Sequence, residues 1–166
     1  MSKKQNKPEQ DHSADPSRID ADRIYDVLAR IRFEVPDHTA SSSEISECMV
    51  KCVRLRESLD QLHMRILRVE GYIKAKLRAA ESLRRIQEIK AWQEPYTQQA
   101  TSARARQRRV NELLIHDDQL ISSLEQQSAK IEAIKRAVAS RLLTAQTTKE
   151  TLSAMHRAAL AEMGAA

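Results

Sequence analysis

Basic and aromatic side chains gather in the middle of this 166-residue chain, where together they could hold a polyanion. The cations are Arg65, Arg68, Lys74, Lys76, Arg78, Arg84 and Arg85, followed by Arg104, Arg106, Arg108 and Arg109. Tyr72, Trp92 and Tyr96 are interleaved with them. Cations that follow a phosphate chain, with aromatic faces for base stacking, are what a binder of single-stranded nucleic acid needs. The alternative for Trp92 and Tyr96 is that they pack into the turn between two helices.

The net charge of +5 is unevenly distributed along the sequence. Residues 51–109 hold 15 basic and 6 acidic side chains, a net charge of +9. Residues 1–50 hold 7 basic and 10 acidic side chains (net −3), and residues 110–166 hold 6 and 7 (net −1). Such a basic block attracts nucleic acid. The other interpretation is a solvated, arginine-rich helix surface.

The sequence contains no pattern of residues that indicates catalysis. It has no glycine-rich phosphate loop, no G-x-S-x-G and no H-E-x-x-H motif. His116, Asp117 and Asp118 are consecutive, so on a helix they point to different faces and do not form a metal site. Cys48 and Cys52, four residues apart, suit neither an intrahelical disulfide nor a zinc site alone. We expect a non-enzymatic protein without metal or cofactor, with these cysteines filling a helix seam in a reducing cytoplasm.

The composition favours long helices over any other architecture. Only two glycines, four prolines and five aromatic residues are present, while helix-forming residues dominate. We predict an all-α fold with a disordered tail at 1–17 and a single domain at 18–166. Its helices are predicted at 20–33, 44–91 and 98–160, with a break at Pro95. Ser41 with Glu44 has the spacing of a capping box for the second helix.

Apolar residues recur at alternating steps of three and four, which is typical of coiled coils. In the second helix the series is Ile45, Met49, Cys52, Leu55, Leu59, Leu62, Ile66, Val69, Ile73, Leu77, Ala80 and Leu83. In the third it is Val110, Leu113, Asp117, Leu120, Leu124, Gln127, Ile131, Ile134, Val138, Arg141, Ala145, Thr148, Leu152 and Met155. The pattern predicts a coiled-coil hairpin. Its apolar stripes would be exposed in a single copy, so we expect a homo-oligomer whose seam includes Leu113, Leu120, Leu124, Ile131, Ile134 and Val138.

Neither a transmembrane helix nor a secretory signal is expected from the sequence. No stretch approaches about 18 consecutive apolar residues, and residues 1–17 are polar. We therefore expect a cytoplasmic location.

Four stretches of the sequence resemble the UvsY-like recombination mediators of bacteriophages, over about residues 20–160. A short amphipathic helix, Ile24–Phe33, precedes the polar loop Asp37–Ser43. Ile66–Glu70 is followed by Ile73–Leu77, which is similar to the basic, leucine-flanked motif that this family associates with single-stranded DNA binding. The last stretch is a C-terminal helix with acidic residues near its start and Arg141 before a final apolar segment. The absence of aromatic residues from that helix, and the arginine-rich segment Gln98–Arg109, depart from the family pattern.

The resemblance implies a phage-encoded, cyclic homo-oligomer that acts in DNA recombination and DNA repair inside the bacterial cell. Such a protein binds single-stranded DNA without sequence preference. It helps a RecA-type recombinase to displace single-strand-binding protein. The resemblance assigns Lys74 and Lys76 to phosphate contacts, with Arg78 as a further candidate.

Two other functions fit the same composition. One is a structural or chaperone-like coiled coil, such as the stalk proteins of bacterial secretion machines, without nucleic-acid binding. A stalk should spread its charge along its length, whereas the basic block of this sequence is central. The other is an RNA-binding regulator, which competition between single-stranded DNA and RNA would distinguish.

Overall fold

The described part of the chain, residues 20–165 of a computed structural model, is built from helices and has no strand. The helices are α1 (Ala21–Arg30), α2 (Ser42–Gln93), α3 (Pro95–Gln98) and α4 (Ala103–Ala165). The predicted all-α class is confirmed, and the long helices pack together. The tail predicted at 1–17 lies outside the described residues.

Local sequence signals set the ends of α2. The Ser41 hydroxyl accepts a hydrogen bond from the Glu44 backbone N–H, and the Glu44 carboxylate accepts one from the Ser41 backbone N–H at 2.8 Å. These bonds complete the predicted capping box. The backbone N–H of Ser41 and its hydroxyl, which both donate to the Glu44 carboxylate, lower the pKa of Glu44. At the other end, Glu94 leaves the helical conformation because it precedes Pro95. The chain then turns through α3 into α4.

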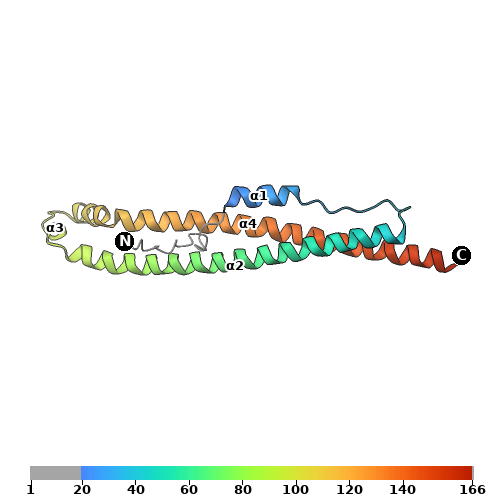
Figure 1. Cartoon of the computed structure of the whole chain (residues 1–166). Helices are drawn as coiled ribbons and strands as arrows, with labels where there is room; N and C mark the ends of the chain where they lie inside the picture. The colour runs from blue at the N-terminus through green and yellow to red at the C-terminus, as the bar shows by residue number, and fades with distance from the viewer. Residues whose placement is uncertain (1–19, 166) are drawn as a thin grey trace, which may run out of the picture.

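Helices α2 and α4 lie side by side and run in opposite directions over most of their length (Figure 1). Three polar contacts show which residues of α2 and α4 lie at the same height along the pair. The Cys52 thiol donates to the Ala145 carbonyl at 3.4 Å, near the start of α2. Further along, Lys135 binds Glu70 at 3.0 Å, and Arg84 binds Asp118 at 2.6 Å.

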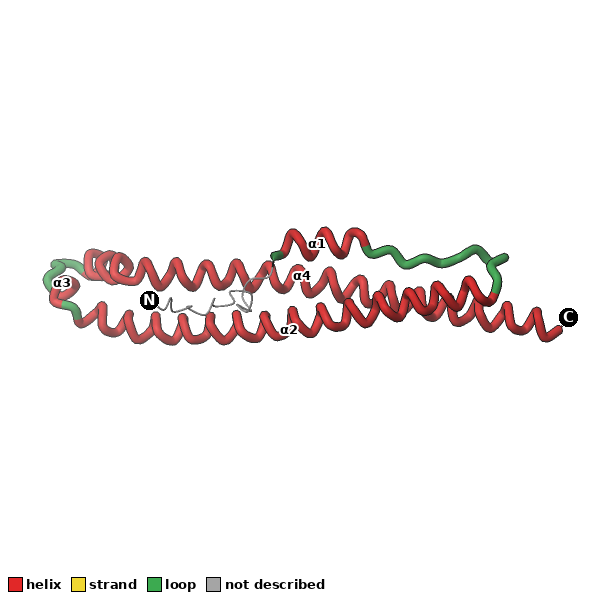
Figure 2. Tube along the Cα trace, in the orientation of Figure 1, coloured by secondary structure: helices red, strands yellow, loops and turns green. Residues whose placement is uncertain are grey.

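Helix α1 is a third layer that covers only the middle of this pair (Figure 2). Its Leu28 packs into a core with residues of both long helices, which are Leu59, Ile66, Val69, Ile73, Ile131, Ile134 and Val138. Between α3 and this covered region the described chain forms only two layers of helix. We call residues 76–128 the tip half of the pair.

The burial of α4 follows the predicted seam in the middle of the pair and departs from it in the tip half. Ile131, Ile134, Val138 and also Leu124 are buried inside the chain's own helix packing. Leu113 and Leu120 are instead 47% and 50% exposed, because Val110 and Leu114 take the inward positions near the tip. Leu83 of α2, also predicted in the seam, is exposed as well. Within one copy these leucines stay exposed because a pair of helices covers a narrower stripe than three helices do. Their place in a seam between copies stays a prediction.

No helix within residues 20–165 combines the length and the apolar character that crossing a membrane requires.

Candidate nucleic-acid interface

Between Gln61 and Gln93, α2 exposes more cations than carboxylates. Its exposed cations are Arg65, Arg68, Lys74, Lys76, Arg78, Arg85 and Lys90. Of the carboxylates of the same segment, Glu70 is buried against α4, and Glu81 and Glu88 are half-buried. From Arg65 to Lys90 the surface extends for about 38 Å at 1.5 Å per residue. We call Arg65, Arg68, Lys76, Arg78, Arg85 and Lys90 the α2 cationic strip. At 3.6 residues per turn, Arg65, Lys76 and Lys90 lie along one flank of the exposed side and Arg78 and Arg85 along the other, with Arg68 between them.

Most of the strip is not neutralised by the chain itself. Arg65, Arg68, Arg78, Arg85 and Lys90 have no ion pair among the described residues. Each is exposed, so it can approach a phosphate without first breaking an internal contact. The sequence analysis did not single out Lys90, because it lies seven residues after Leu83 and the heptad pattern would place it in the seam.

Lys76 lies over an aromatic ring. Its ammonium group is 4.6 Å from the centre of the Tyr72 ring, which is itself partly exposed. A cation and an aromatic face therefore occur together on the strip, as base stacking beside a phosphate would require.

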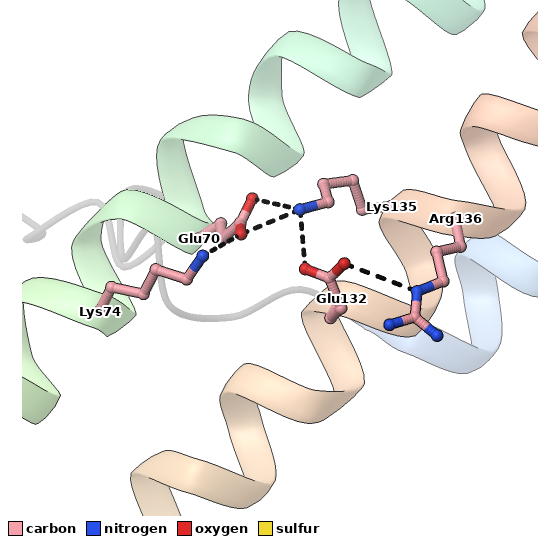
Figure 3. Close-up of polar contacts among 5 residues, drawn as sticks. All are labelled: Glu70, Lys74, Glu132, Lys135 and Arg136. Atoms are coloured by element: carbon pink, nitrogen blue, oxygen red, sulfur yellow. Dashed lines mark hydrogen bonds and ion pairs between the residues drawn. The ribbon is translucent and has the colours of Figure 1, made fainter.

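Lys74, which the resemblance assigns to phosphate contact, belongs to an ion network between α2 and α4 (Figure 3). It donates to Glu70 at 2.5 Å, and Lys135 of α4 binds the same carboxylate at 3.0 Å. Lys135 also binds Glu132 at 2.7 Å, and Glu132 binds Arg136 at 3.5 Å. Glu70 is buried, and the hydrogen bonds from Lys74 and Lys135 lower its pKa. The network holds the two helices in register, so Lys74 has a structural role.

Arg84 has a similar role closer to the tip. It donates to Asp118 of α4 at 2.6 Å and to Glu88 of its own helix at 2.8 Å. The hydrogen bond to Asp118, with the neighbouring charges, raises the pKa of Arg84. Since two carboxylates already occupy its guanidinium, we exclude Arg84 from the strip.

The predicted arginine cluster at the tip mostly holds the turn together. Arg109 lies over the Tyr96 ring at 4.3 Å and donates to the Tyr96 carbonyl. Arg106 donates to the Ala100 carbonyl at 3.1 Å, and Arg108 pairs with Glu112 at 3.1 Å. Arg104 alone in this cluster is exposed without such a contact among the described residues.

Of the two aromatic residues near the tip, one packs into the turn and the other stays exposed. The sequence left both possibilities open. Trp92 is half-buried and packs on Ala91, Val110 and Leu114, inside the tip core. Tyr96 is about half exposed, with its ring under Arg109. Trp92 therefore stabilises the turn, whereas Tyr96 keeps an accessible edge.

The charge is uneven along the sequence, but in the folded chain the net charge is the same toward the tip and away from it. The tip half holds 9 basic and 7 acidic side chains, a net charge of +2. The remaining described residues, 20–75 and 129–165, hold 15 and 13, also +2. The antiparallel pairing places Asp118 of α4 beside Arg84, in the basic second half of α2. The uneven charge that remains is between the exposed side of α2, which is basic, and the side that faces α4.

The remaining candidate groups carry no site within the described residues. No cluster of three or more histidines, cysteines or carboxylates there could hold a metal ion. Cys52 is buried with Ile45 and Leu152, and this burial raises the pKa of its thiol. Cys48 packs against the same cluster.

Comparison of the chain with protein-family models, with curated proteins and with solved structures finds no significant match.

Proposed function

We propose that this chain binds single-stranded nucleic acid without sequence preference along the α2 cationic strip. The observation that carries the proposal is the segment from Gln61 to Gln93, which exposes seven cations and buries or half-buries its three carboxylates. A strand that crosses the exposed side of α2 along this segment would meet positive charge over about 38 Å of helix. Binding of this kind is mostly electrostatic, tolerates any base and weakens steeply with salt.

The biological role we propose is that of a recombination mediator. The resemblance to UvsY-like proteins supports single-stranded DNA as the ligand, with a RecA-type recombinase and single-strand-binding protein as partners. In this role α2 and α4 act as a coiled-coil hairpin, and several copies present their strips to one strand. Multiple weak sites on one assembly gain avidity without new contacts.

The test is fluorescence anisotropy with labelled oligo-dT and a triple variant, Arg68→Gln, Arg78→Gln and Arg85→Gln. We expect at least about tenfold weaker binding, and a salt slope that is flatter by about two because each phosphate contact contributes about 0.7. The matched control is Lys130→Gln, Arg136→Gln and Arg157→Gln, which removes the same charge from exposed positions of α4.

The control variant should bind like the wild type. If both triple variants lose the same affinity, only net charge matters, and the strip is not the site. Competition of oligo-dT with oligo-U separates a DNA-binding mediator from an RNA-binding regulator.

A second candidate is a structural or chaperone-like coiled coil of the secretion-stalk type. Two observations favour it: the net charge is equal in the two parts of the pair, and α2 and α4 bury most of their apolar seam against each other. A stalk would show no salt-sensitive binding of oligo-dT, so the same titration decides between the two candidates.

A further inference from the structure

Tyr72 is the exposed aromatic residue of the segment that carries the α2 cationic strip. The stretch from Gln61 to Gln93 contains one tyrosine, one tryptophan and no phenylalanine. Trp92 is half-buried in the tip core, whereas Tyr72 is 37% exposed. Tyr72 is therefore the aromatic side chain of this segment that a bound strand can reach.

Cations lie on both sides of Tyr72 along the helix. Arg68 is four residues before it and Lys76 is four residues after it, so the three side chains form one row on the surface of α2. From Arg68 to Lys76 the row extends for about 12 Å along the helix axis. Arg65, seven residues before Tyr72, lies on the same flank. A strand whose phosphates follow these cations passes over the tyrosine ring.

The Tyr72 ring has room for a single base. The ammonium group of Lys76 lies over one face of the ring, 4.6 Å from its centre. The opposite face is the one that remains for stacking. Each copy of the chain can thus hold one base in this way, in addition to its phosphate contacts.

We infer that Tyr72 makes the α2 cationic strip selective for unpaired strands over duplex, by stacking one base on its ring. The inference rests on the proposed function and adds the residue that distinguishes the two forms of nucleic acid. Cations alone do not favour a single strand, because duplex DNA has the higher charge density. Each neutralised phosphate contributes about 0.9 to the salt slope in a duplex and about 0.7 in a single strand.

A duplex cannot use the Tyr72 ring without opening. Its base faces are stacked on each other, and a side chain reaches such a face only after the base is unpaired and unstacked. A flexible single strand exposes its base faces at a smaller cost. Stacking of one base on an aromatic side chain strengthens binding by about tenfold or more, for any base.

Fluorescence anisotropy with three labelled ligands of equal length tests the inference. The ligands are oligo-dT, an abasic strand with the same backbone, and a duplex. The wild type should bind oligo-dT most tightly. Tyr72→Leu should weaken the binding of oligo-dT by about tenfold and leave that of the other two ligands within about twofold. Its salt slope should not change, because the variant removes a ring and no cation.

Tyr96→Leu is the matched control. Tyr96 is also partly exposed with a cation over its ring, Arg109 at 4.3 Å, but it lies in α3, outside the strip. This variant should bind all three ligands like the wild type. Tyr72→Phe keeps the ring and should keep the affinity for oligo-dT. Both variants at Tyr72 should retain the helical circular dichroism, since the side chain is partly exposed.

Photochemical crosslinking locates the stacked base. Oligo-dT that carries 5-iodouracil should crosslink to Tyr72 on irradiation, as identified by mass spectrometry of the digested chain. Crosslinks at Trp92 or Tyr96 without any at Tyr72 overturn the inference.

The binding assays separate this inference from the proposed function. A wild type that binds none of the ligands contradicts both. A wild type that binds with the expected salt slope supports the proposed function. The inference alone then fails if Tyr72→Leu binds oligo-dT equally well, if it loses the abasic strand to the same extent, or if the wild type prefers the duplex.

Discussion

Two regions of one face of this molecule carry the same sequence signal and have different surroundings. Ile134 and Leu120 are equivalent positions of one uninterrupted three-four pattern in α4, yet Ile134 is buried and Leu120 is half exposed. The difference is α1, which is ten residues long and reaches only the middle of the pair. A heptad pattern thus identifies which residues share a face, whereas burial depends on what else packs against that face.

The largest expected effect is a difference in stability between substitutions at these two positions. Ile134→Ala should lower the free energy of unfolding by about 2–5 kcal/mol, because it opens a cavity in a three-helix core. Leu120→Ala should cost less than about 1 kcal/mol, since half of its side chain is already in water. Urea unfolding at low protein concentration, followed by circular dichroism, measures both. Equal costs would show that the two regions are equally packed.

A smaller loss of stability is expected from weakening the contact of α1 with the two long helices. Leu28→Ala should cost about 2 kcal/mol, because α1 can detach locally while the long helices stay paired. Hydrogen exchange should accelerate in residues 20–35 and around Val69, and residues 76–128 should be unchanged. Faster exchange throughout the tip half would mean that α1 stabilises the whole pair.

The ion network under this region predicts how stability depends on pH. The pKa of Glu70 is lowered, chiefly by its hydrogen bond from Lys74, and that of Glu132 chiefly by its hydrogen bond from Lys135. A carboxyl whose pKa is lower in the folded state stabilises the fold above its ordinary value near 4.5. This contribution is lost as the pH falls through the lowered value. Between pH 7 and pH 3 the Tm of the wild type should therefore fall more than that of Glu70→Gln. An equal fall of Tm in both proteins would show that the ion network does not contribute to the pH dependence of stability.

The smallest effect is expected at the ion pair in the tip half. Arg84 and Asp118 are both substantially exposed to solvent, so screening limits the value of their contact. Arg84→Gln should change Tm by no more than about 2 °C at physiological salt. A drop as large as that of a core substitution would show that the tip depends on this pair for its register.

Local features were predictable from the sequence, and non-local pairings were not. Ser41 with Glu44 and the break at Pro95 act through neighbouring residues, and the structure contains both. That Lys74 shares Glu70 with Lys135 depends on which stretch of α4 lies level with it, sixty residues away in sequence or more. For the same reason the basic block could be counted from the sequence, but the pairing of Arg84 with Asp118 of α4 could not be predicted.

The most direct test of the nucleic-acid proposal is the affinity of the wild-type chain for oligo-dT across a salt series. If the six residues of the α2 cationic strip contact phosphates, the dissociation constant should be micromolar at about 50 mM salt. A plot of log affinity against log salt should then have a slope of about −4. A chain that fails to bind at about 50 µM protein in low salt, or that binds independently of salt, contradicts the proposal.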